Sequence, residues 1–214
     1  MVASDVDFTE YQPIYATKVS YYQGDQMPSA NVILLRFERI DNKNTGLSGE
    51  HISVVYDIID NKLMGYTRMQ SHLNNESCVA HQQARQTAIK FLKMVAPDLI
   101  SNDAQMPELN ELESSERMVF ESVVRIGNVE LNWVSGHYEI IKINGIEKHV
   151  YGMKVKFFIP SNNLWGWVII DKNNQVETFE RNVSWNFVAK QRQTQMWLHD
   201  SWLIEQGITL IKIA

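Results

Sequence analysis

The segment Leu164–Trp185, LWGWVIIDKNNQVETFERNVSW, constrains the fold of this chain more than any other stretch. Two runs rich in β-branched and aromatic residues flank the polar residues DKNNQ, a pattern typical of two strands joined by a tight turn. Strands joined by so short a turn run in opposite directions. The segment therefore predicts an antiparallel hairpin.

A shorter echo of this segment, DIIDNKLMGYTR, occupies Asp57–Arg68. With a two-residue insertion in the turn, Asp60 aligns with Asp171 and Tyr66 aligns with Phe179. Similar segments that recur along a chain indicate a repeated structural unit. We therefore expect two related hairpins, one in each half of the protein.

The elements predicted around the hairpins follow the same order in both halves. Alternating apolar residues predict strands, and alanines at helical spacing before Pro97 predict a helix that Ser77 caps. In the first half, the expected strands are 14–22, 31–40, 51–59 and 63–69, and the helix is 77–95. In the second half, the expected strands are 118–126, 129–143 and 151–159 before the hairpin, the helix is 190–206, and a tail strand is 208–213.

A connector of low apolar content separates the two halves. Residues 101–117, SNDAQMPELNELESSER, carry five acidic side chains and one proline. We interpret this stretch as a solvated linker, which divides the chain into units 1–100 and 118–214. The predicted fold is α+β, with two related β-β-β-α units and one helix covering each antiparallel sheet. A single curved sheet, as in carriers of the half-barrel type, is left open.

This arrangement resembles the PepSY family, small modules associated with peptidase propeptides that often occur in tandem in bacterial surface or secreted proteins. The resemblance covers Asn31–Ala96 and Tyr151–Gln206. It rests on the aspartate that the family commonly has in the turn of its last hairpin, a place that Asp60 and Asp171 fit. The resemblance implies an inhibitory, chaperone-like or regulatory binding role without catalytic residues.

Charge and composition exclude several classes of protein. The 214 residues have a formal net charge of −5 and no dense block of Lys or Arg, which argues against nucleic acid and anionic membranes as partners. No apolar run is long enough to cross a bilayer, and the N-terminus lacks the regions of a signal peptide. We expect a soluble, cytoplasmic protein, or a periplasmic or secreted one if Met1 replaces a removed signal peptide.

Few residues are arranged for catalysis or metal binding. The single cysteine, Cys78, has no partner for a disulfide or a CxxC pair, and no two of the six histidines have the i, i+4 spacing of a helical zinc site. No nucleotide-binding glycine motif occurs, so we expect neither a metal nor a cofactor. His137 and Glu139 alternate on one strand face and are the candidate acid–base pair. His199 and Asp200 follow each other on the predicted helix and should not face one another.

All six tryptophans lie after residue 130. They either fill a core between sheet and helix or form the wall of a groove, because binding pockets combine aromatic walls with a few polar groups. In the second interpretation, two charged residues orient the ligand. The candidate ligand-binding residues are Trp165, Trp167, Glu177, Phe179, Arg181 and Trp185.

Three functions are compatible with these features. The first is a non-enzymatic binding or inhibitory module for a protein or peptide, because no reactive constellation is visible and sheet edges can accept a peptide strand. The second is a carrier of a small hydrophobic or aromatic ligand in a tryptophan-lined cup. The third is a cone-shaped α+β enzyme that uses His137 and Glu139 for acid–base catalysis. A large cavity would favour the second and third functions over the first.

Overall fold

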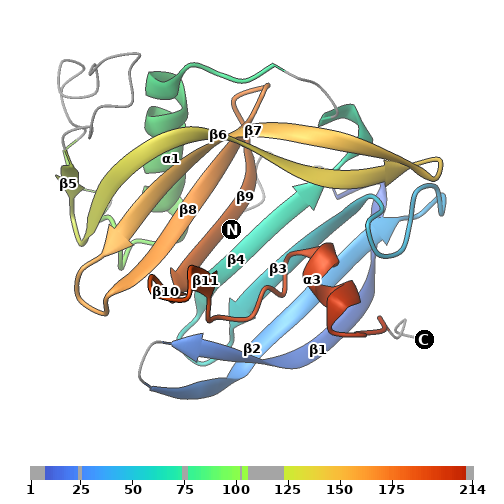
Figure 1. The fold of residues 1–214 in the computed structure, drawn as a ribbon, viewed down its shortest axis with the longest axis horizontal. Coiled ribbons are helices and arrows are strands. Elements are labelled where there is room, and N and C mark those ends of the chain that lie inside the picture. The colour runs from blue at the N-terminus through green and yellow to red at the C-terminus, as the bar shows by residue number, and fades with distance from the viewer. Residues whose placement is uncertain (1–7, 24–25, 74–76, 102, 106–122, 211–214) are drawn as a thin grey trace.

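A computed structural model describes residues 8–23, 26–73, 77–101, 103–105 and 123–210 of the chain. Nine strands form a single antiparallel sheet in the order β1-β2-β3-β4-β9-β8-β7-β6-β5 (Figure 1). These strands are β1 (Tyr11–Gln23), β2 (Gln26–Arg39), β3 (His51–Asp57), β4 (Lys62–Met69), β5 (Val124–Ile126), β6 (Val129–Ile143), β7 (Ile146–Ile159), β8 (Leu164–Asp171) and β9 (Val176–Val183). The other elements are the 3-10 helix η1 (Ser71–Leu73), α1 (His81–Val95), β10 (Trp185–Asn186), β11 (Gln191–Arg192) and α3 (Asp200–Glu205).

The prediction of two β-β-β-α units, each with its own sheet and helix, is wrong. Strands β1–β4 and β6–β9 are two meanders that join edge to edge through β4 and β9. Three residue pairs make this seam, with Tyr66 opposite Phe179 at its centre. An unpaired strand edge exposes free backbone N–H and C=O groups, and the seam satisfies two such edges at once. The single merged sheet that the sequence left open is the observed arrangement.

The two hairpins that the sequence predicted have matching irregularities. The β3–β4 ladder shifts register between Val55 and Tyr56, and the β8–β9 ladder shifts between Ile169 and Ile170. This match places Asp57, rather than Asp60, at the position of Asp171. Both carboxylates accept hydrogen bonds from backbone N–H groups of the turn that follows them. The alignment of the two hairpin sequences was therefore correct for their second strands. For their first strands it was shifted by three residues.

Helix α1 packs on one face of the sheet, which we call the outer face. Phe91 contacts Phe179 edge-on with 5.4 Å between ring centroids, and Ala84 and Ala88 are fully buried against the strands. The helix begins four residues later than predicted, and Ala80 rather than Ser77 is its N-cap. The small side chains let the helix approach the sheet closely.

The second predicted helix, 190–206, is wrong for most of its length. Residues 191–192 form the short strand β11, and helix begins only at Asp200. Lys190, in the turn of a small β10–β11 hairpin, has a positive φ of 51°, which is not a helical conformation. The segment from Ser184 to Leu210, which we call the C-terminal segment, crosses the inner face of the sheet, opposite α1 (Figure 1).

The sheet curls around this inner face at both ends. Near one end, the Tyr21 hydroxyl on β1 donates to the carbonyl of Arg181 on β9, at 2.7 Å. At the other end, the β6–β7 hairpin reaches the β2–β3 loop, where the Lys142 N–H donates to Ser48 O at 2.7 Å. The Asn144 N–H adds a bond to the Asn44 side chain at 2.9 Å. The sheet therefore forms a cup, with the C-terminal segment inside it.

Three predicted segments lie partly or wholly outside the described residues. These are the acidic connector beyond residue 105, the start of the strand predicted at 118–126, and the end of the tail strand predicted at 208–213. Within the strand predicted at 118–126, residues 124–126 form β5. Within the predicted tail strand, the described residues 208–210 are not in a strand.

Candidate functional site

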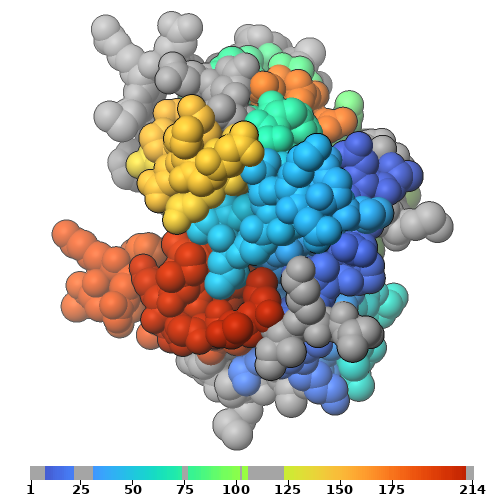
Figure 2. All heavy atoms as spheres, turned by 90° about the vertical axis from the view of Figure 1, so that its right-hand side faces the viewer, coloured from blue at the N-terminus to red at the C-terminus, as the bar shows by residue number. Residues whose placement is uncertain are grey.

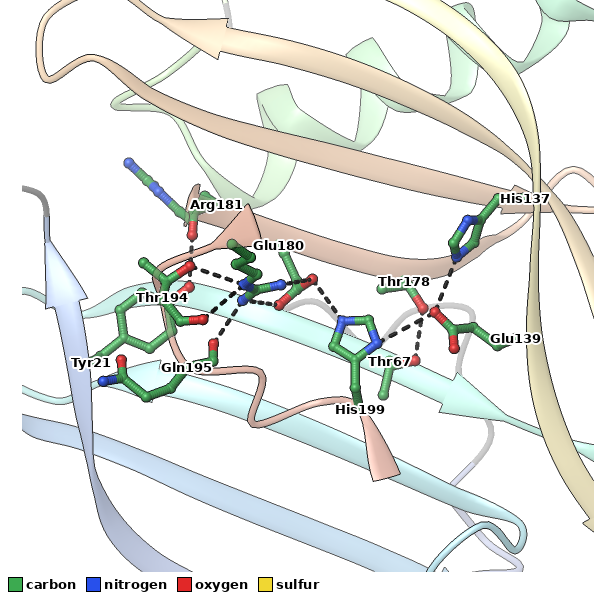
Figure 3. Close-up of polar contacts among 11 residues, drawn as sticks. Tyr21, Thr67, His137, Glu139, Thr178, Glu180, Arg181, Thr194, Gln195 and His199 are labelled. Carbon is green, nitrogen blue, oxygen red and sulfur yellow. Dashed lines mark hydrogen bonds and ion pairs between the residues drawn. The ribbon is translucent and has the colours of Figure 1, made fainter. Parts of the chain in front are cut away.

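The inner face carries a chain of buried charges that links the sheet to the C-terminal segment (Figure 3). It begins at Glu180 on β9, whose carboxylate accepts two hydrogen bonds from Arg192 at 3.0 and 2.8 Å. Arg192 also donates to Thr194 and to the carbonyl of Gln195. Burial alone would raise the pKa of Glu180, but Arg192 and His199 hold it well below its usual range.

His199 lies between two carboxylates. Its Nε2 is 2.9 Å from Glu180 Oε2, and its Nδ1 is 3.3 Å from Glu139 Oε1. Burial opposes the charged form of the ring, but the two carboxylates outweigh burial and raise the pKa of His199 to about 9. The ring is therefore an imidazolium at neutral pH, with both N–H groups used.

The same oxygen of Glu139 also forms a hydrogen bond with a second histidine. His137 Nε2 lies 3.0 Å from Glu139 Oε1, so the two residues that alternate along β6 are in contact. Burial favours the neutral carboxyl, yet the two imidazoles lower the pKa of Glu139 to about 2. A carboxylate with so low a pKa is a weak base at neutral pH.

A second charged group fixes α3 to the β2–β3 loop. Asp200 accepts two hydrogen bonds from Arg36 at 2.7 and 3.1 Å and one from the Ser48 N–H at 2.6 Å. Arg36 is also bonded to Glu38 and is 1% exposed. His199 and Asp200 thus point to different partners, as their succession along the chain indicated.

His51 lies beside this group and is neutral. Its Nδ1 is 2.9 Å from the carbonyl of Gly49, which makes Nδ1 the donor and leaves a lone pair on Nε2. Nε2 is buried and has no hydrogen-bond partner among the described residues. Burial, with the nearby Arg36 charge, lowers the pKa of His51 to about 4 although Asp200 opposes the shift.

A cavity of about 430 Å³ opens between these groups. Its rim is formed by the β2–β3 loop, the β6–β7 hairpin and α3, which are light blue, yellow and red in Figure 2. Its lining combines apolar and ionisable side chains. The lining includes His51, Met69, Glu139, Ile140, Leu198 and Ile204.

The predicted ligand-binding residues do not meet in this cavity. Bulges in β9 break the alternation of its side chains, so that Phe179 and Arg181 face outward while Glu177 lies against Gly152. Phe179 packs on α1, and Arg181 donates two hydrogen bonds to Asp98 at 2.9 and 2.6 Å. Arg181 and Asp98 line a separate, mostly polar hollow of about 200 Å³ at the opposite rim of the sheet.

The three predicted tryptophans do not line the cavity, and Trp165 and Trp167 pack in one apolar cluster. Trp167 is opposite Glu180 in the ladder and has the Lys154 ammonium 4.0 Å from its ring centre. Trp165 contacts Phe187 at 6.3 Å between ring centroids. Trp185 begins the β10–β11 hairpin and is 39% exposed. None of the described residues that line the larger cavity is a tryptophan.

Sequence reasoning missed four buried ionisable residues at and beside the cavity, of which His51 is in its lining. Glu180, Arg192, Arg36 and His51 come from four separate segments, and only the pairing of distant strands brings them together. One signal was available, because charged residues at inward positions of otherwise apolar strands are costly to bury unless they have partners.

The described residues contain no group of three or more His, Cys, Asp or Glu side chains that could hold a metal ion. None of the described helices is long and apolar enough to cross a membrane. Comparison with models of protein families, with curated proteins and with solved structures found no significant match.

Proposed function

We propose that this protein binds a small ligand in the cavity on the inner face, as a carrier or a ligand-binding protein. The observation that carries the proposal is the cavity itself, which at about 430 Å³ lies within the range typical of small-molecule sites. Such sites have mostly apolar walls and a few polar groups that orient the ligand. Met69, Leu198 and Ile204 supply apolar wall, and His51 and Glu139 supply polar groups.

Hydrogen bonds within the protein connect the elements of the cavity rim. Arg36 ties α3 to the β2–β3 loop through Asp200, and the β6–β7 hairpin is bonded to the same loop at Ser48. A site whose walls are already ordered loses less conformational freedom on binding. This rigidity supports a preformed binding site.

The test compares two substitutions on α3 that introduce the same side chain. Ser201 lines the cavity and is exposed, whereas Gln206 ends the helix outside the lining. A fragment library with neutral, anionic and cationic members is screened by ligand-detected NMR. We expect ligands of the wild-type protein to lose binding to Ser201→Trp and to retain it with Gln206→Trp. A screen without ligands, or ligands that bind both variants equally, contradicts the proposal.

A protein or peptide partner is the second candidate, and a different observation favours it. The β10–β11 hairpin projects from the body, orange-red at the left of Figure 2, and its tip exposes Phe187 by 67% and Val188 by 96%. Exposed apolar tips often mark contact surfaces. Cross-linking in the host should link a partner to Lys190, and the double substitution Phe187→Ser, Val188→Ser should abolish the link.

A further inference from the structure

The lining of the cavity carries more carboxylates than cationic side chains, and among the described contacts one carboxylate oxygen of Glu139 is not engaged. From this asymmetry we infer that the ligand is a small amine, bound as an ammonium ion with an apolar body. The inference rests on the proposed function and adds the chemical class of the ligand. Three observations support it: an unpartnered imidazole, a carboxylate oxygen that is not engaged, and an excess of negative charge.

The imidazole is His51. Its side chain is 2% exposed, and the bond between Nδ1 and the Gly49 carbonyl fixes the tautomer in which Nε2 accepts. A buried acceptor without a partner costs free energy, because it has given up its bond to water. His51 lines the cavity, but its Nε2 is covered by neighbouring atoms, so a ligand donor would remove this cost only after the lining shifts to expose Nε2.

The carboxylate is Glu139. The bonds from His137 and His199 both end on Oε1, so that among the described contacts Oε2 is left for a donor. The side chain is about three-quarters buried, with 25% exposed at the cavity. A charged hydrogen bond in such a setting is shorter and stronger than a neutral one.

Several other polar groups around the cavity have partners in the protein. Thr67 and Thr178 bond to each other at 2.7 Å, both ring nitrogens of His199 are used, and Lys142 lies 3.9 Å from Glu147. Four carboxylates line the cavity against two cationic side chains, which are Lys142 and the His199 ring. The excess of carboxylates therefore favours a cation over an anion at this site.

The apolar lining accounts for the rest of the ligand. Met69, Ile140, Leu198 and Ile204 surround the space next to the polar groups. Burial of an aliphatic or aromatic body against them is favourable, whereas a strongly hydrophilic ligand such as a polyamine would leave them without a complementary surface. An arylalkylamine combines one ammonium group with such a body.

The experiment uses three compounds that share a phenyl ring and differ in the polar group: 2-phenylethylamine, 2-phenylethanol and 3-phenylpropionate. Their affinities for the full chain are measured at pH 7 by calorimetry. We expect the amine to bind at least tenfold more tightly than the other two. Glu139→Gln should weaken the amine about tenfold and leave the alcohol unchanged, whereas Glu130→Gln, on the same strand outside the cavity, should change neither.

The outcomes separate the two proposals. If the alcohol or the acid binds as tightly as the amine and Ser201→Trp removes that binding, the cavity is a ligand site but the amine inference is wrong. If none of the three compounds nor any library member binds, both proposals fail. Should Glu139→Gln unfold, Glu205→Gln at the exposed rim replaces it, with a smaller expected loss of amine affinity as the supporting result and no loss as the opposing one.

Discussion

Glu177 and Met64 occupy equivalent bulges in the two hairpins, but their chemistry differs. Met64 packs with Val55 and Leu198 in an apolar cluster, as expected for a buried bulge residue. Glu177 is fully buried, and neither of its carboxylate oxygens has a partner among the described residues. Burial, together with the charges of Glu139 and Asp171, raises the pKa of Glu177 to about 8, so the folded protein holds it as the neutral acid at pH 7.

Replacement of this acid by its neutral isostere should stabilise the protein. The unfolded carboxyl titrates near 4.5 and the folded one near 8, so wild-type stability falls as pH rises between these values and then levels off. Glu177→Gln should match the wild type near pH 4 and exceed it increasingly up to pH 8. Urea unfolding from pH 4 to 9 measures the difference. Glu147→Gln, at an exposed carboxylate, is the control, and a difference that does not change with pH contradicts the assignment.

His199 should stabilise the folded protein through its charged form, and this stabilisation should be lost at alkaline pH. Its folded pKa of about 9 lies above the ordinary value of 6.5, so its stabilisation is complete below pH 6.5 and is lost as pH rises through 9. His199→Gln removes one partner from a buried ionic group and should cost on the order of 3 kcal/mol at pH 6, with a smaller cost at pH 10. Chemical unfolding of both proteins at these pH values tests this, with the exposed His149→Gln as the control.

The contacts of single side chains could be predicted from the sequence only where the local geometry of the strand determines them. The contact between His137 and Glu139 follows from their alternation along one strand. Adjacent Glu180 and Arg181 are typical salt-bridge residues, and each does form a salt bridge, but on opposite faces of the sheet. The partners, Arg192 and Asp98, could not be identified because nothing in the sequence places them next to β9.

Among the elements, β8 depends on a glycine for its packing. A Cβ at Gly166 would lie 2.2 Å from Phe157 Cζ and 2.7 Å from the Glu180 carbonyl oxygen. Gly166→Ala should therefore destabilise the sheet by roughly 1–3 kcal/mol, because it overpacks a site bounded by backbone. Gly136→Ala on β6 is the matched control, since a Cβ there would have no atom within 4 Å beyond its chain neighbours. Equal melting temperatures for the two variants would contradict this explanation.

The C-terminal segment explains why apolar spacing alone predicted too long a helix. Thr194, Leu198 and Trp202 recur at helical intervals, and Leu198 does pack into the apolar cluster of the inner face. The ion pairs of this segment instead accompany an irregular backbone: Arg192 and His199 both contact Glu180 on β9, and Asp200 contacts Arg36 on β2.

For the molecule as a whole, closure of the cup depends on contacts between two loops. Asn44 has a positive φ of 50° and accepts the Asn144 N–H, while its own side-chain amide donates to Glu50. Asn44→Ala should speed hydrogen exchange of the Asn144 amide at least tenfold. Asn163→Ala, at an exposed turn with a φ of 57°, carries the same backbone penalty and should leave that amide protected. Equal protection in both variants would show that this contact does not hold the rim.

The global arrangement lay beyond sequence reasoning for a physical reason. Hairpins are local, and turn residues and alternation predicted both of them. The seam between β4 and β9 is made by three residue pairs more than 100 positions apart, and no local pattern specifies it. The cavity follows from that seam and from the curl of the sheet, so neither its position nor its lining could be read from the chain.

The seam also affects how the chain is made. While the protein is being synthesised, β4 can pair with β3 at once, but its other edge has no partner until β9 has left the ribosome. At typical rates of translation, this delay lasts roughly 5–20 s. During that time, the N-terminal meander exposes a strand edge that can pair with another nascent chain. Misassembly should therefore fall when translation of the second half is accelerated or when a chaperone covers β4.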